Sequence, residues 1–133
     1  MLVIKRRGER GAKSREKWAA TAREAAKQAR RSWLPVVGGD PDCSTKQIAA
    51  RLASAAVAFV LHEDARVPLT SADLPSSGEI VLVVGPEGGI SDAERLAFEE
   101  VGAVAVRLGR EVLRTSTAGV AALAVLSARL GRW

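Results

Sequence analysis

The sequence predicts an α/β fold with a parallel sheet, and two features of the chain carry this prediction. Short apolar runs alternate with segments of helical character, which is the order found when parallel strands are joined by helices. The run over residues 80–84 (IVLVV) is apolar at every position, so it predicts a strand buried on both faces. With 133 residues, 47% of them hydrophobic and 26% charged, the chain has the composition of one globular domain over residues 1–133.

The first half of the chain predicts a loop, two helices and a strand. Residues 8–14 are polar and contain glycine, which favours a loop. Residues 15–32 predict a helix, and Pro35 prevents its continuation. Residues 45–55 predict a short helix and residues 57–61 a buried strand. The apolar stripe of the first helix consists of Trp18, Ala22, Ala25, Ala29 and Trp33.

The second half repeats the alternation of strand and helix. A polar loop over residues 68–77 precedes the strand at 80–84. Ser91 and Glu94, three positions apart and ahead of apolar residues, predict a capping box that starts a helix. Gly102 lies where a C-terminal cap is expected. A short strand at 104–106, a loop at 110–114 and an apolar helix from 115 to 130 complete the prediction.

Three loops follow the predicted strands. They are His62 with Glu63, the glycine-rich residues 85–89, and residues 108–114. In parallel sheets ligands bind beyond the carboxyl ends of the strands, so we expect these loops to form one binding rim. The glycine-rich loop lacks the Gly-Lys-Ser/Thr of a phosphate loop and the Gly-x-Gly-x-x-Gly of dinucleotide sites.

Positive charge is concentrated at the N-terminal end. Residues 1–31 carry 11 Lys and Arg against three Glu, a net +8, whereas the whole chain carries +5. This asymmetry favours a polyanion partner such as nucleic acid, with a solvated basic helix as the alternative. No stacking platform of interleaved aromatic residues is visible. The aromatic residues are Trp18, Trp33, Trp133, Phe59 and Phe98.

Other classes of protein are disfavoured by the composition. The longest charge-free run, residues 115–128, is too short to span a bilayer, and the N-terminus lacks a signal-peptide pattern. Cys43 has no second cysteine to pair with, and one cysteine and one histidine (His62) are too few for a zinc site. We therefore expect a cytoplasmic protein with no metal and no membrane contact.

Three segments, in order along the chain, resemble motifs of one enzyme superfamily. Residues 81–94 (VLVVGPEGGISDAE) closely resemble the signature of SPOUT methyltransferases that modify small-subunit ribosomal RNA, and in particular that of the uridine-N3 methyltransferases. Residues 108–118 (LGREVLRTSTA) resemble the motif Leu-Gly-x-x-Ile-Leu-Arg-x-Glu-Thr-Ala, with Ser116 in place of Glu. Residues 24–31 (EAAKQARR) resemble the motif Glu-Ala-x-x-Gln-x-x-Arg.

The resemblance implies a parallel sheet with a C-terminal trefoil knot, an S-adenosylmethionine (S-adenosyl-L-methionine) site in the knot, and a homodimer with the last helix at its interface. The partner would be ribosomal RNA or the small ribosomal subunit. The cofactor contacts it implies are Leu61, His62, Glu63, Gly85, Pro86, Glu87, Gly88, Gly89, Leu108, Gly109, Leu113, Arg114, Thr117 and Ala118.

Two arginines are the candidate catalytic residues. Methylation at N3 of uridine requires the ring to lose a proton, and an arginine retains the charge that stabilises the anion. Arg31 and Arg114 are the candidates, and for Arg31 a solvent-exposed or phosphate-contacting role is the alternative. The candidate RNA-binding residues are Arg23, Lys27, Gln28, Arg30 and Arg31.

The resemblance also implies parts that this sequence does not show. Family members have an N-terminal barrel domain like PUA, and we expect the chain to lack this domain together with the first strand and helix of the catalytic domain. A non-catalytic knotted dimer that keeps cofactor or RNA binding is therefore an alternative to an active enzyme. A generic nucleotide-binding α/β domain is a third, supported by the glycine loop alone.

Overall fold

The computed structural model describes residues 2–4, 9–30, 32–38 and 43–133. The chain divides into two compact units: a main unit of residues 1–4 and 44–133, and a smaller unit of residues 5–43. Within the described residues, no helix has the length and apolar character needed to cross a membrane.

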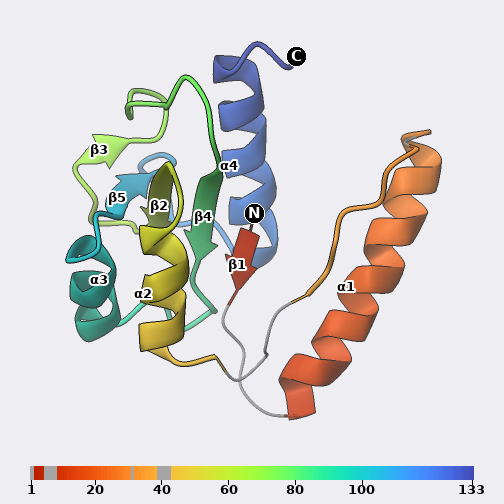
Figure 1. Ribbon diagram of the computed structural model, residues 1–133, viewed down its shortest axis with the longest axis horizontal. Coiled ribbons are helices and arrows are strands. Elements are labelled where there is room, and N and C mark those ends of the chain that lie inside the picture. Colours follow the sequence, from red (N-terminus) through yellow and green to blue (C-terminus); the bar gives the residue numbers. More distant parts are fainter. Residues whose placement is uncertain (1, 5–8, 31, 39–42) are drawn as a thin grey trace. The chain divides into compact units, whose positions relative to one another are not determined.

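The main unit is built on a five-stranded parallel sheet (Figure 1). Its strands follow the order β1-β4-β2-β5-β3, and all four pairings between neighbours are parallel, as predicted. The strands are β1 (Leu2–Ile4), β2 (Val57–Leu61), β3 (Val67–Pro68), β4 (Ile80–Val84) and β5 (Val104–Arg107). The loop predicted from residue 68 is wrong at its first residue, which belongs to β3. Two residues are too few to show a hydrophobic pattern, and only the pairing with β5 makes them a strand.

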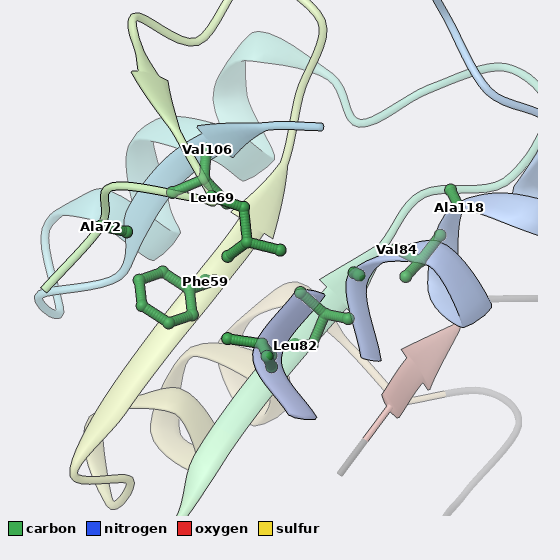
Figure 2. Close-up of a cluster of buried hydrophobic side chains, with 9 residues drawn as sticks. Phe59, Leu69, Ala72, Leu82, Val84, Val106 and Ala118 are labelled. Atoms are coloured by element: carbon green, nitrogen blue, oxygen red, sulfur yellow. The ribbon is translucent and has the colours of Figure 1, made fainter. Parts of the chain in front are cut away.

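Three helices cover the sheet of the main unit: α2 (Thr45–Ala53), α3 (Asp92–Glu99) and α4 (Thr115–Arg129). Figure 2 shows α4 in front of the sheet and the other two helices behind it. The predicted capping box at Ser91 and Glu94 is confirmed, and Ser44 with Gln47 forms a second one at the start of α2. Gly102, at φ +90°, occupies the left-handed conformation expected just after α3.

The core lies on both faces of the sheet because successive strand residues point to opposite sides. The strand residues Val60, Val81 and Val106 are fully buried, each with 0% of its surface exposed. One face packs against α4 (Figure 2). The buried residues of that cluster are Phe59, Leu69, Ala72, Leu82, Val84, Val106, Ala118, Ala122 and Leu126.

The smaller unit consists of α1 (Glu9–Gln28) and an extended segment after it. The helix includes residues predicted as a loop, because Gly11 is the one poor helix former among residues 9–14. It also ends earlier than predicted, at Gln28, and Arg30 follows in the left-handed region at φ 50°. The predicted apolar stripe is wrong beyond Ala22, since Ala26 is buried whereas Ala25, Ala29 and Trp33 are exposed.

Candidate functional site

A cavity of about 720 Å³ lies at the carboxyl edge of the sheet. Its walls are the loops after β2, β4 and β5 together with the first turn of α4, so the three predicted loops do form one rim. A cavity of this size is typical of a small-molecule site. The predicted cofactor contacts that line it are Leu61, His62, Glu63, Gly85, Pro86, Glu87, Gly88, Gly89, Leu108, Gly109, Leu113, Arg114 and Ala118.

One predicted cofactor contact, Thr117, is absent from the lining of the cavity. Thr117 is exposed, whereas the next residue of α4, Ala118, is buried and reaches the cavity. Successive residues of a helix point about 100° apart, so neighbours in a motif face different surroundings. The lining includes eight further residues that had not been singled out as contacts: Val84, Ile90, Arg107, Arg110, Glu111, Val112, Thr115 and Ser116.

The glycine loop after β4 is folded back tightly on itself. The Gly89 N–H donates a hydrogen bond of 2.9 Å to the Pro86 carbonyl oxygen, and Gly89 has a φ of +76° that side chains rarely allow. A Cβ added at Gly85 would lie 2.9 Å from Ile90 Cγ1 and 3.2 Å from the Gly89 carbonyl carbon. By contrast, nothing lies within 4 Å of a Cβ added at Gly88. Gly85 and Gly89 therefore serve the loop itself, while Gly88 leaves room at the cavity wall.

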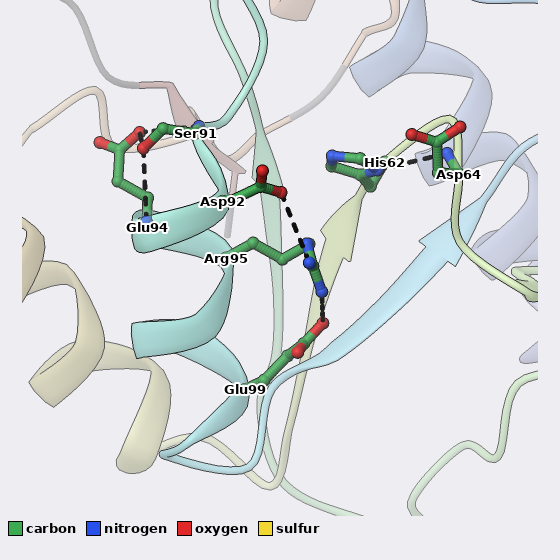
Figure 3. Close-up of polar contacts among 7 residues, drawn as sticks. All are labelled: His62, Asp64, Ser91, Asp92, Glu94, Arg95 and Glu99. Carbon is green, nitrogen blue, oxygen red and sulfur yellow. Dashed lines mark hydrogen bonds and ion pairs between the residues drawn. The ribbon is translucent and has the colours of Figure 1, made fainter.

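The start of α3 holds the far end of this loop (Figure 3). The Glu94 N–H donates to Ser91 Oγ at 3.3 Å, and the Ser91 N–H donates to Glu94 Oε2 at 3.1 Å. Further along α3, Arg95 donates to Glu99 Oε1 at 2.8 Å. This hydrogen bond is the main reason why the pKa of Arg95 is raised, with a smaller contribution from Asp92. Because Ser91 and Glu94 form the capping box, the glycine loop leads directly into a helix whose first turn is capped.

The near end of the loop is held by α4, through a contact that the sequence did not reveal. The Thr115 hydroxyl donates a hydrogen bond of 3.0 Å to the Gly85 carbonyl oxygen, and the pair is partly buried. Both residues line the cavity, so this bond joins two of its walls. The preceding residue, Arg114, is the N-cap of α4 and makes no side-chain capping bond. Arg114 is exposed and lines the cavity.

His62 contributes a ring whose tautomer is set by the backbone. The Asp64 N–H donates to His62 Nδ1 at 3.2 Å (Figure 3), so the neutral ring carries its proton on Nε2. A ring in this tautomer offers a hydrogen-bond donor to a ligand. Nδ1 is engaged as the acceptor of the bond from Asp64.

The charged side chains of the cavity are balanced in number but divided between the loops. Three arginines, Arg107, Arg110 and Arg114, come from β5 and the loop that follows it. Glu63 and Glu87 come from the other two loops, and Glu111 comes from the arginine-rich one. Both signs of charge are therefore available to a ligand that carries both. Among the described residues, no group of three His, Cys, Asp or Glu side chains could hold a metal ion.

The candidate RNA-binding residues belong to the smaller unit. Arg23, Lys27 and Gln28 are exposed on the last turns of α1, and Arg30 is exposed just beyond it. Lys27 forms an ion pair of 2.9 Å with Glu24, both in solvent, where such pairs contribute little. Arg31, a candidate catalytic residue, lies outside the described residues.

The fold and the cavity define a parallel α/β domain with a small-ligand site at the carboxyl edge of its sheet. The chain matches the family described as "RNA methyltransferase domain" over residues 2–127, and it belongs to that family. It is 41% identical to the Ribosomal RNA small subunit methyltransferase E of Mycobacterium bovis, over 95% of this chain and 49% of the relative. The protein of the same name from Bacillus subtilis is 33% identical, over 94% of this chain and 51% of the relative. The chain thus spans about half the length of these relatives.

Solved structures agree with the family assignment. A Ribosomal RNA small subunit methyltransferase E from Neisseria gonorrhoeae, bound to S-adenosyl methionine, superposes with a TM-score of 0.78 at 30% identity, covering 96% of this chain and 52% of that chain. A protein from Legionella pneumophila, in complex with the bound cofactor SAM, superposes with a TM-score of 0.76 at 30% identity, covering 96% and 53%.

Proposed function

We propose that this chain binds S-adenosylmethionine in the cavity at the carboxyl edge of the sheet and transfers its methyl group to N3 of a uridine in 16S ribosomal RNA. The observation that carries the proposal is the composition of that cavity: its walls bring together every predicted cofactor contact except Thr117. Membership of the RNA methyltransferase family and two relatives of known structure with this cofactor bound support the reaction class. The choice of uridine N3 rests on the resemblance of the three sequence motifs.

The cavity fits the cofactor in size and in chemistry. Gly88 exposes its backbone without a side chain, so a ligand can lie against main-chain donors and acceptors. Leu61, Leu108 and Leu113 offer apolar contact area for an adenine ring. Glutamates and arginines in the cavity lining suit the ammonium and carboxylate groups of the methionine moiety. Bound S-adenosylmethionine supplies an electrophilic methyl group on a sulfonium.

The remaining work of the protein is to position the uridine and stabilise its anion. The ring carries a proton on N3 at neutral pH, and negative charge develops on the ring as that proton passes to water. Arg114 lines the cavity, and a guanidinium carries the positive charge that stabilises such an anion, so we assign it the stabilising role. Arg31 is the second candidate. We assign Arg23, Lys27, Gln28, Arg30 and Arg31 to contacts with the RNA.

The proposal includes an assembly. The chain corresponds to the catalytic half of its longer relatives, forms a trefoil knot at its C-terminal end, and works as a homodimer in the cytoplasm. What supports the dimer is α4, whose outer surface leaves Val120, Leu123 and Leu130 exposed by 68%, 46% and 37%. An apolar strip of this kind on one helix is typical of an interface.

Calorimetric titration of the purified chain with S-adenosylmethionine tests the cofactor site. S-adenosylhomocysteine should also bind, whereas ATP and NAD should not. Preference for ATP or NAD would overturn the proposal in favour of a generic nucleotide-binding domain.

Methyl transfer is tested with small-subunit RNA and isotopically labelled cofactor. Digestion of the product to nucleosides should yield labelled N3-methyluridine, and a labelled nucleoside of another kind would refute the assigned position. Tight cofactor binding with no transfer, even after the other half of one of the longer relatives is added in trans, would identify a non-catalytic binding module.

A further inference from the structure

The extended segment after α1 exposes large apolar side chains to solvent. Trp33 is 65% exposed, Leu34 49% and Val36 88%. Single exposed apolar residues are common on protein surfaces, but three within four positions, one of them a tryptophan, are typical of a binding surface. Pro35 fixes φ within this segment and disfavours a helix at Leu34, so the segment stays extended.

Cationic side chains precede Trp33 at short distance along the chain. Lys27 lies in the last turn of α1, and Arg30 lies three residues before the tryptophan. Arg30 has a φ of 50°, in a region that favours glycine, and this turn redirects the chain at the end of the helix. In Figure 1 the chain reverses its direction after α1. The tryptophan therefore follows the most basic helix of the protein by a few residues along the chain.

Charge and aromatic character together select the kind of partner. Residues 1–31 carry a net charge of +8, which attracts a polyanion and disfavours an ordinary apolar protein partner. An indole ring presents a flat face on which any nucleobase can stack, while nearby cations hold the phosphates. A base inside a duplex is already stacked on its neighbours, so only an unpaired base has a face free to stack on the indole ring.

We propose that Trp33 is a stacking site for an unpaired base of the RNA substrate, with Lys27 and Arg30 holding the adjoining phosphates. This inference rests on the proposed RNA substrate and adds to it a contact that recognises single-stranded structure rather than charge alone. In this proposal the cations supply affinity for any RNA, and Trp33 supplies a preference for the unpaired bases of a loop or an end.

Tryptophan emission gives the direct test. In the 133-residue chain carrying Trp18→Phe and Trp133→Phe, Trp33 is the one remaining tryptophan. A short single-stranded oligouridylate should quench its emission in a saturable manner, and a blunt RNA duplex of equal length should not. The matched control keeps Trp133, which is 82% exposed and follows Arg132, and replaces the other two tryptophans by Phe. Its emission should not change.

Affinities separate stacking from charge. Trp33→Ala should weaken binding of the oligouridylate by about 5- to 150-fold, the range expected for the loss of one base stack. Trp33→Phe should recover part of this loss and Trp33→Leu none, although leucine is equally apolar. Lys27→Gln should reduce the dependence of the affinity on salt concentration, and Trp33→Ala should leave that dependence unchanged.

The outcomes distinguish this inference from the proposed function. If the oligouridylate binds with unchanged affinity to Trp33→Ala and Trp33 emission stays constant, the stacking site is refuted while RNA binding by the basic helix stands. If Trp33 emission shifts with protein concentration in the absence of RNA, a second copy of the chain covers the segment and the inference is overturned. If no RNA binds at all, both proposals fall. Cofactor binding by Trp33→Ala should equal that of the wild type in calorimetry.

Discussion

Gly88 offers a way to block the proposed cofactor site while leaving the fold intact. A Cβ at this position would meet no protein atom within 4 Å, and Gly88 is not among the glycines with positive φ. Gly88→Val should therefore fold normally, with a free energy of unfolding within about 1 kcal/mol of the wild type. Replacing glycine lowers the conformational entropy of the unfolded chain, and this gain offsets small losses of stability in the folded state. In the bound state the branched side chain would occupy space at the cavity wall.

The expected loss of binding follows from the energy of overpacking. Forcing extra methyl groups into a filled site costs about 1–3 kcal/mol, which corresponds to a rise of about 5- to 150-fold in the Kd for S-adenosylmethionine. Gly88→Ala, with one carbon instead of three, should lie between the wild type and Gly88→Val. Calorimetric titration of the three proteins measures this series, and urea unfolding checks their stability.

Gly85→Ala is the contrasting variant. Its Cβ would lie 2.9 Å from Ile90 Cγ1 and 3.3 Å from the Ile90 backbone nitrogen, so the loop itself must shift. We expect a loss of about 1–3 kcal/mol in the free energy of unfolding. If Gly88→Val bound the cofactor as tightly as the wild type, the glycine loop would not be a wall of the cofactor site, and the reasoning from Gly88 would be refuted.

Three further predictions concern the supports of the site and of the fold. Thr115→Val removes the hydroxyl that donates to the Gly85 carbonyl oxygen, so we expect the free energy of unfolding to fall by about 1 kcal/mol and the Kd for the cofactor to rise several-fold. Thr115→Ser should restore both values, and equal affinities of Thr115→Val and the wild type in calorimetry would contradict this reasoning. Ser91→Ala removes the side-chain cap of α3 and should lower the free energy of unfolding by about 1 kcal/mol in urea titrations; an unchanged midpoint would show that the cap is dispensable. The hydrogen bond from Arg51 lowers the pKa of Glu79 below its ordinary 4.5, so the stability that this pair supplies is present above pH 4.5 and is lost as the pH falls below it. Unfolding of Glu79→Gln should depend less steeply on pH in that range than unfolding of the wild type, and parallel profiles would exclude the linkage.

Local patterns in the sequence determined most of the sheet and the place of the site. The apolar run at 80–84 is a buried strand, and Ser91 with Glu94 is a capping box, because both features depend on residues within a few positions of one another. The rim followed from one further rule, that parallel strands end at a common edge. The loops after β2, β4 and β5 accordingly share one cavity.

Other features were decided by tertiary structure alone. The two residues of β3 form a strand because β5 pairs with them. Two residues are too few for a hydrophobic pattern in the sequence to predict that strand. The bond from Thr115 to Gly85 joins residues 30 positions apart, a distance over which periodicity carries no information. Thr117 and Ala118 stand side by side in one motif, yet only the packing of α4 on the sheet decides which of them reaches the cavity. Hydrophobic spacing records which residues avoid water, whereas the tertiary contacts determine what each of them meets instead.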